Sequence, residues 1–209
     1  MKTIACALLA GLLASPVQAD ENLKKVQNRL ESEVNKILVI LKDKKIERDE
    51  KRTRVMKIVD GLFDLKLTGK LVLGRTYWPK FDERQREQFI DFFVAQVKDS
   101  YFEKVDLLTD ESVEFEKAFF QGKKIHVKTR IVAKDKRYEM IYKLYLKEDK
   151  WLVYDVEIEG ISVIKSYSSQ YDQYLRKNSI PDLLKKMKEK TIDAPKDLRD
   201  AKTSEKKKA

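Results

Sequence analysis

Few side chains in this sequence could carry out catalysis. The 209-residue chain has a single histidine, His126, and a single cysteine, Cys6. It contains no Gly-x-Ser-x-Gly motif, no phosphate-binding loop and no cluster of metal-ligand residues. A lone histidine on a polar strand face is more often a surface residue than a base or a ligand. The sequence therefore predicts neither a catalytic residue nor a metal site.

Asp155 is the best remaining candidate, because a carboxylate beside an apolar pocket can act as a general base. It belongs to a segment starting at Trp151, in which apolar residues alternate with Asp155, Glu157 and Glu159. This period of two predicts a strand with one buried face and one wet face. The buried face carries Leu152, Tyr154, Val156 and Ile158. Asp155 then lies on the wet face, so we expect a protein that is not an enzyme.

A helix must follow directly after this strand. The apolar spacing becomes helical after Gly160, and Ser162 can cap the N-terminus of the helix. The apolar stripe of the helix consists of Val163, Ile164, Tyr167, Tyr171 and Tyr174. Strand and helix therefore share one apolar surface, against which the rest of the chain can be placed.

Helical patterns dominate the first half of the chain. Residues 21–41 and 43–63 are amphipathic, and residues 65–74 form a short apolar segment that a left-handed Gly74 can end. Asp82 and Gln85 form a capping box for the next helix, which is rich in aromatic residues. Its apolar stripe consists of Phe89, Phe92, Phe93, Val97 and Tyr101.

The period of the apolar residues becomes two from Val113 onward. Turns near residues 121–122, 134–136 and 148–149 separate the alternating segments. Short connections of this kind indicate an antiparallel meander of four strands. Helices first and strands afterwards predict an α+β fold, with the helices packed on one face of a curved sheet.

The beginning of the chain is typical of a secretory signal peptide. A lysine at position 2 precedes an apolar run from Ile4 to Leu13, and small residues ending at Ala19 form a cleavage site. The run is too short to span a bilayer, so we expect a soluble mature protein. Cleavage removes Cys6, and a mature chain without cysteine fits a bacterial periplasm.

These features divide the chain into three parts. We predict a signal peptide at residues 1–19 and one folded domain at residues 20–190. Residues 191–209 are rich in lysine and poor in apolar residues, which predicts a disordered tail. The net charge of +10 suits nucleic acid, an anionic membrane or an acidic protein face. Export argues against nucleic acid, and we expect a monomer.

Several short motifs together carry a resemblance to a known family. They are Leu71-Val72-Leu73-Gly74 with Tyr77, Gln85-Arg86 with Phe89 and Tyr101, and Trp151, Tyr154-Asp155 and Glu159-Gly160-Ile161-Ser162. They resemble the periplasmic toluene-tolerance, or MlaC, family from the first helix to Lys190. The chain departs from the family pattern by an extra residue between Gly74 and Gln85, a shortened turn at Glu148-Asp149 and the lysine-rich tail.

The resemblance implies a fold and a function. The fold would be NTF2-like or cystatin-like, with acyl chains held between helices and sheet. The function would be that of a soluble carrier of phospholipid between an outer-membrane lipoprotein–porin complex and an inner-membrane ABC transporter with an MCE-domain component. Such a carrier maintains outer-membrane lipid asymmetry. A hopanoid-associated carrier, an NTF2-like small-molecule enzyme and an adaptor with a filled core stay open as alternatives.

We predict a lipid cavity between the aromatic helix and the final strand and helix. From the apolar periodicity we expect it to be lined by Leu73, Phe89, Phe93, Val97, Tyr101, Tyr142, Leu144, Val156, Ile158, Val163, Ile164 and Tyr167. The headgroup should stay in water at the mouth, because burying an unpaired phosphate is costly. Arg75, Lys80 and Arg86 are the nearest cations in sequence to the aromatic loop. Phospholipid is the cargo, and we expect no other cofactor.

Overall fold

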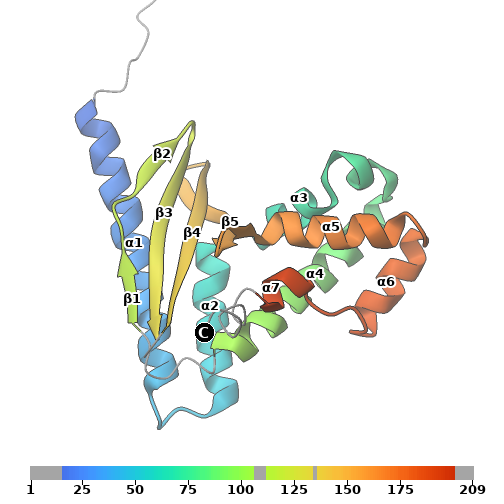
Figure 1. The fold of residues 1–209 in the computed structure, drawn as a ribbon, viewed down its shortest axis with the longest axis horizontal. Coiled ribbons are helices and arrows are strands. Elements are labelled where there is room, and N and C mark those ends of the chain that lie inside the picture. Colours follow the sequence, from blue (N-terminus) through green and yellow to red (C-terminus); the bar gives the residue numbers. More distant parts are fainter. Residues whose placement is uncertain (1–15, 106–111, 134–135, 201–209) are drawn as a thin grey trace, which may run out of the picture.

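The computed structural model describes residues 16–105, 112–133 and 136–200 of the chain. Within these residues the chain forms seven α-helices, one short 3-10 helix and six β-strands. Figure 1 shows the sheet flanked by the two N-terminal helices, with the remaining helices grouped beside it. No helix among the described residues is long and apolar enough to cross a membrane.

The first two helices form a hairpin that covers part of the sheet. They are α1 (Pro16–Lys42) and α2 (Arg48–Leu62), which correspond to the predicted helices 21–41 and 43–63. Residues 43–47 make the connection, so α2 begins later than predicted. Most of the predicted signal peptide lies outside the described residues, and its last four residues belong to α1.

The next helices follow local signals in the sequence. They are α3 (Leu65–Tyr77), the 3-10 helix η1 (Trp78–Lys80) and α4 (Glu83–Val105). Gly74 has a φ of +59° and interrupts the helical conformation inside α3, as expected of a residue without a Cβ atom. The backbone N–H of Asp82 donates to Gln85 Oε1 at 3.0 Å, and the N–H of Gln85 donates to Asp82 Oδ1 at 2.8 Å. This pair confirms the predicted capping box.

The strands form one antiparallel sheet, which confirms the α+β fold. They are β1 (Ser112–Phe115), β2 (Phe119–Gln121), β3 (Lys124–Ala133), β4 (Lys136–Lys147), β5 (Lys150–Ile158) and β6 (Ile161–Ser162). Six strands replace the predicted four for two reasons. The first predicted strand is interrupted, so that β1 and β2 pair with successive parts of β3, and the two-residue β6 adds to β5. Between β1 and β2, the N–H of Ala118 donates to Gln27 of α1.

The strand β5 differs from the predicted alternation. The β4–β5 register shifts so that Lys143 lies opposite Asp155 while Leu144 lies opposite Val153. Tyr154 is therefore the extra residue of a β-bulge, which reverses the alternation before it. Val153 is fully buried in the core where Leu152 and Tyr154 were expected.

The C-terminal helices complete the fold. They are α5 (Val163–Leu175), α6 (Ile180–Lys188) and α7 (Lys196–Asp200). Ser162 accepts a hydrogen bond from the N–H of Lys165, which confirms the predicted N-cap of α5. The predicted disordered tail begins with a folded segment, because Leu198 of α7 is 3 % exposed. Ser166 of α5 also donates to the carboxylate of Asp197 at 2.6 Å. Residues 201–209 lie outside the described part of the chain.

Candidate functional site

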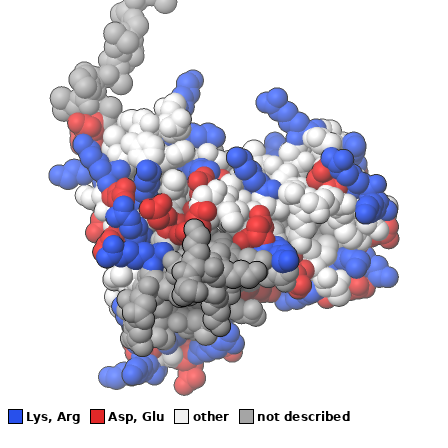
Figure 2. All heavy atoms as spheres, in the orientation of Figure 1, with Lys and Arg blue, Asp and Glu red and all other residues white. Residues whose placement is uncertain are grey.

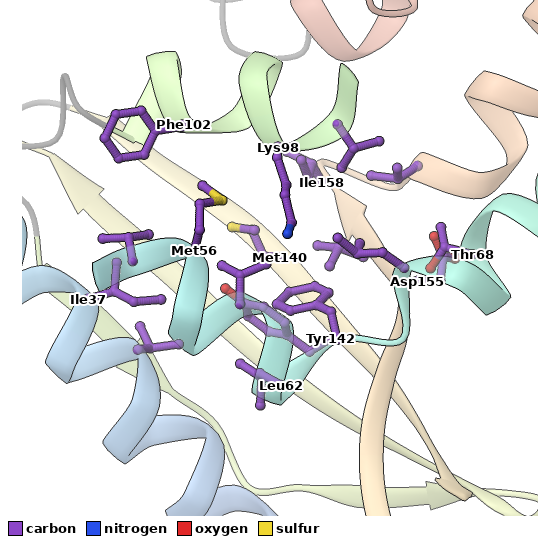
Figure 3. Close-up of a pocket in the computed structure, with 18 of the residues that line it drawn as sticks. Ile37, Met56, Leu62, Thr68, Lys98, Phe102, Met140, Tyr142, Asp155 and Ile158 are labelled. Atoms are coloured by element: carbon purple, nitrogen blue, oxygen red, sulfur yellow. The ribbon is translucent and has the colours of Figure 1, made fainter. Parts of the chain in front are cut away.

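An apolar cavity lies between the α1–α2 hairpin, the second half of α4 and one end of the sheet (Figure 3). Its volume is about 230 Å³. An apolar cavity of about 150 Å³ is large enough to bind benzene, and one water molecule needs far less space. The cavity is therefore much larger than a packing defect, and it can hold part of an organic ligand.

The cavity walls are apolar or aromatic except at Thr68, Lys98 and Asp155. The helices contribute Val34, Ile37, Leu38, Val55, Met56, Val59, Leu62, Leu65, Val97, Phe102 and Val163. The sheet and the connection before α3 contribute Val113, Ile131, Met140, Tyr142, Tyr154, Val156, Ile158 and Phe63. Such a surface favours an apolar ligand and gives it few polar groups to bind.

One face of the sheet is divided between a packed region and the cavity. At one end, α1 covers Ile125 and Val127 of β3, which are fully buried. Further along the same strand and on the same face, Ile131 lines the cavity. The cavity thus occupies the part of the sheet face that α1 leaves uncovered.

Polar contacts hold α2 at both of its ends. Near its C-terminus, Arg29 of α1 donates to the carbonyl oxygens of Gly61 and Trp151, both at 2.8 Å. Near its N-terminus, Arg52 forms an ion pair with Asp99 of α4. The middle of α2 lies over the cavity, so this helix forms an outer wall that is fastened at its ends.

Asp64 fixes the chain where α2 leads into α3. Its carboxylate accepts hydrogen bonds from the N–H of Leu67 at 2.9 Å, from the Tyr145 hydroxyl at 2.6 Å and from Lys147 Nζ at 2.9 Å. Burial acts to raise the pKa of Asp64, but these hydrogen bonds and the lysine charge outweigh it and lower the pKa. The backbone N–H of Asp64 also donates to Val153 of β5. The cavity wall is thereby joined to the sheet.

Lys98 carries the one positive charge among the described residues that line the cavity. Figure 3 shows its side chain extending from α4 into the space between α2 and the sheet. Its Nζ atom lies 2.6 Å from Oδ1 of Asp60 on α2. The lysine side chain is 21 % exposed and the aspartate side chain is 56 % exposed, so the pair stands at the rim of the cavity.

Tyr142 supplies a second polar group. Its side chain projects from β4 into the cavity (Figure 3), and burial raises the pKa of its hydroxyl to about 12. The hydroxyl is therefore protonated at neutral pH and can donate a hydrogen bond to a ligand oxygen.

Asp155 is buried, which corrects its predicted place on a wet face. It is 6 % exposed and accepts hydrogen bonds from Lys143 Nζ at 3.1 Å, Ser162 Oγ at 2.8 Å and the N–H of Ile164 at 3.1 Å. Lys143 also pairs with Glu157 at 2.8 Å. Asp155 thus joins β4, β5 and the start of α5, and these contacts account for its burial.

Five of the twelve residues predicted to contact lipid line the cavity. They are Val97, Tyr142, Val156, Ile158 and Val163. Their elements were predicted to meet, and the structure brings them together around the empty space. Their contact with lipid stays a prediction.

The aromatic residues occupy a packed core instead. We call Phe81, Phe89, Phe93, Tyr167 and Tyr171 the aromatic core; each is at most 1 % exposed. The ring centroid of Phe89 lies 5.9 Å from that of Phe93 and 5.5 Å from that of Tyr171, and Phe93 lies 5.3 Å from Tyr167. These separations leave no room for a ligand between the rings. The region predicted to hold the cavity is therefore filled.

Three further predicted residues, Leu73, Leu144 and Ile164, do not line the cavity. Leu73 is buried in the cluster that contains the aromatic core, and Ile164 packs against that cluster. Leu144 packs with the α1 side chains on the other half of the sheet. The side chain of Tyr101 lies outside the described part of the structure.

The three predicted headgroup cations do not line the cavity. Arg86 donates from Nε to the carbonyl oxygen of Trp78 at 3.0 Å and lies over its ring, and Lys80 lies over the ring of Tyr77. Arg75 is exposed in the last turn of α3. The first two side chains thus cover the aromatic loop.

The sequence interpretation missed the wall formed by α1 and α2. Ile37, Leu38, Met56 and Val59 are partly exposed to the cavity, and Phe102 closes the wall on α4. The amphipathic stripes of residues 21–41 and 43–63 indicated that these side chains face inward. A stripe does not indicate whether the space in front of it is filled.

His126, the single histidine, packs against an aromatic ring and is partly buried. The ring of His126 lies 5.6 Å from that of Phe119, and burial lowers its pKa, followed by the charges of Lys143 and Lys124. Among the described residues, no group of three or more potential metal ligands comes together.

A solved structure shares this fold. It is a phospholipid-binding protein from Ralstonia solanacearum, solved in complex with a phospholipid, with a TM-score of 0.69. The two chains are 19 % identical, and the match covers 78 % of this chain and 95 % of the other. No curated protein matches the chain.

The fold and the site define an α+β protein built around an apolar cavity that can hold a ligand. The family model described as MlaC protein matches residues 31–189. The chain therefore belongs to the MlaC family, which confirms the resemblance carried by its motifs.

Proposed function

We propose that this protein binds a phospholipid in the cavity and carries it through the periplasm. The observation that carries the proposal is the cavity of about 230 Å³ with an almost entirely apolar wall, beside a core that is otherwise packed. Membership of the MlaC family supports the proposal. So does the shared fold with a protein solved in complex with a phospholipid.

The size of the hydrophobic effect determines how such a carrier must work. Burying one methylene stabilises the bound lipid by about 0.8 kcal/mol. Moving a diacyl lipid with about 30 methylenes into water therefore costs a free energy on the order of 20 kcal/mol. Spontaneous escape is then negligibly slow. Transfer must take place while the cavity is held against a donor or an acceptor that offers a continuous apolar path. The open cavity would widen as acyl chains enter it beneath α2.

The partners proposed on the two sides are membrane complexes. The carrier exchanges lipid with an outer-membrane lipoprotein–porin complex and with an inner-membrane ABC transporter that has an MCE-domain component. This exchange maintains the lipid asymmetry of the outer membrane.

On the face shown in Figure 2, Lys and Arg side chains are interspersed with Asp and Glu. Attraction to partners therefore depends on local groups of charge, such as the lysines of residues 44–57, and weakens with salt.

The proposed cargo is tested by filling the cavity. A tryptophan in place of Val59, which lines the cavity on α2, should displace bound lipid because it occupies the same space. Val39→Trp is the control, since Val39 is 69 % exposed on the neighbouring helix. Native mass spectrometry of protein purified without detergent should find phospholipid on the wild type and the control. Equal lipid on folded Val59→Trp would place the binding site elsewhere.

The proposed mode of transfer is tested separately. Donor carrier and the MCE-domain component are placed on the two sides of a dialysis membrane, or mixed together at increasing salt. We expect transfer only on mixing, with a rate that falls as salt rises. Undiminished transfer across the dialysis membrane would rule out transfer by contact, and salt-independent transfer on mixing would remove the steering role alone.

A further inference from the structure

The rim of the cavity carries an ion pair that the packing of the fold does not require. Lys98 and Asp60 meet at 2.6 Å across the gap between α4 and α2. A second ion pair, Arg52 with Asp99, already joins the same two helices one helical position away on α4. Lys190 adds to that second pair at 2.8 Å from Asp99. The helices are thus also held together at Asp99, and neither Arg52 nor Asp99 itself lines the cavity.

Lys98 differs from its neighbour by its place on the cavity wall. Its side chain borders the apolar space (Figure 3), while its ammonium group pairs with the exposed carboxylate of Asp60 and the side chain as a whole is 21 % exposed. A lysine side chain in this arrangement keeps its charge in water while its methylenes cover apolar surface. A ligand with apolar chains inside the cavity would carry its polar group to the same rim.

The partner of Lys98 can be replaced. Asp60 is 56 % exposed, so its carboxylate is hydrated as soon as the pair separates. Because one partner is largely exposed, water screens the attraction within the pair, which contributes on the order of 1 kcal/mol. An anionic group that is brought to the rim by its own apolar chains can therefore compete with Asp60 for Lys98.

Resting on the proposed function, we infer that Lys98 binds the phosphodiester group of the bound phospholipid, and that this group replaces Asp60 as its partner. Lys98 thereby selects phosphate-bearing lipids over neutral lipids with the same acyl chains. Asp60 holds the ammonium group at the rim while the cavity is empty. The aromatic loop near Arg86 and Lys80 has no part in this selection.

The experiment measures which lipid the protein captures from a mixed membrane. Protein freed of lipid is incubated with vesicles that contain dipalmitoyl phosphatidylglycerol and dipalmitoylglycerol, and the captured lipids are quantified by mass spectrometry. In Lys98→Gln the ratio of phosphatidylglycerol to dipalmitoylglycerol should fall about tenfold, because one charge-assisted hydrogen bond is lost. In Asp60→Asn the ratio should rise about two- to fivefold, because the competing carboxylate is removed.

The opposite signs distinguish a ligand site from a structural ion pair. If the pair only joined α2 to α4, both variants would break the same contact and change the ratio alike, which would overturn the inference. Lys190→Gln is the matched control, since it removes a lysine from the neighbouring ion pair outside the cavity and should leave the ratio unchanged. A shift in this control equal to that of Lys98→Gln would also overturn it.

Two further outcomes separate the possible failures. A wild type that captures neither lipid would refute the proposed function, whereas capture with a ratio that Lys98→Gln leaves unchanged would refute only the role of Lys98. Excess inorganic phosphate should leave the wild-type ratio unchanged, because a free anion has no acyl chains to hold it at the rim. If inorganic phosphate lowered the ratio as far as Lys98→Gln does, the site would bind free anions and the inference would be wrong.

Discussion

The aromatic core and the cavity lie side by side and are both lined by apolar residues, yet one is filled and the other is open. In the aromatic core, rings from α4 and α5 meet at centroid distances of 5.3 to 5.9 Å. In the cavity, side chains of α1, α2, α4 and the sheet face one another across about 230 Å³. Apolar composition alone therefore does not decide whether a region closes.

The difference follows from how the helices are held. Gly69 of α3 lets that helix approach α4 so closely that an added Cβ atom would stand 2.7 Å from Ile90 and 3.0 Å from Phe93. By contrast, α2 is fastened at its ends through Arg29 and Asp99, and its middle does not reach the sheet. Close helix contact fills one region, and contacts at the helix ends keep the other open.

The largest effect should come from removing a ring of the aromatic core. Phe93→Ala should lower the free energy of unfolding by about 3–5 kcal/mol, because it leaves a new cavity in a packed region. Phe63→Ala, at the cavity wall, should lower the free energy of unfolding by clearly less than Phe93→Ala does. Its main effect should be a smaller amount of bound lipid. Chemical denaturation together with lipid quantification measures both. Equal losses of stability would mean that the two regions are packed alike.

The next effect tests the close approach of α3 and α4. Gly69→Ala should lower the free energy of unfolding by about 1–3 kcal/mol, since the added methyl group overpacks the contact with Ile90 and Phe93. Gly61→Ala in α2 is the control, because its Cβ atom would meet nothing within 4 Å. The free energy of unfolding of Gly61→Ala should rise by up to about 1 kcal/mol, because alanine has a higher helix propensity than glycine. A stable Gly69→Ala variant would show that the filled region can expand.

A smaller effect should come from protonating the carboxylate of Asp64, which fixes the chain at the end of α2. Because the folded protein lowers the pKa of this carboxyl, its stabilising contribution is present above the ordinary value of about 3.9 and is lost as the pH falls through the folded pKa. Asp64→Asn should therefore cost about 1–2 kcal/mol at neutral pH, and its difference from the wild type should vanish in acid. Denaturation curves across pH measure this. A difference that persists unchanged in acid would assign the anchor to groups other than the ionised carboxylate.

The smallest effect should come from the Tyr142 hydroxyl. Tyr142→Phe keeps the ring in the cavity wall and removes one hydrogen-bond donor, so it should weaken phospholipid retention by about two- to fivefold. The free energy of unfolding should change little. Lipid release into acceptor vesicles measures the effect, with wild-type rates as the reference. Unchanged release would mean that the ligand meets only apolar groups at this point.

Local signals in the sequence predicted the local structure well. The capping box of Asp82 and Gln85 and the N-cap at Ser162 form because the partner atoms are only three residues apart. The positive φ angle at Gly74 was also expected, because a residue without a Cβ atom adopts it without strain. The α+β arrangement followed from the change in apolar period, since each period belongs to one type of element.

Features that depend on distant partners could not be predicted in this way. The bulge at Tyr154 depends on the register with β4, and the alternation of Leu152 and Tyr154 is equally consistent with a regular strand. The periodicity of Phe89 and Phe93 indicated inward-facing rings, but Tyr167 and Tyr171 decide that these rings are packed. The cavity needs the placement of α2, which depends on contacts as far apart in sequence as Arg52 and Asp99.

The interruption of the first edge strand bears on how the protein avoids aggregation. A long, flat edge offers unpaired backbone groups to strands of other chains. Here the edge is broken between Phe115 and Phe119, where the N–H of Ala118 donates to Gln27 of α1. At the opposite edge, β6 pairs with β5, and Phe63 forms an isolated bridge with Val153 of β5. Along the described strands, the sheet therefore offers the strands of a second chain few unpaired backbone groups.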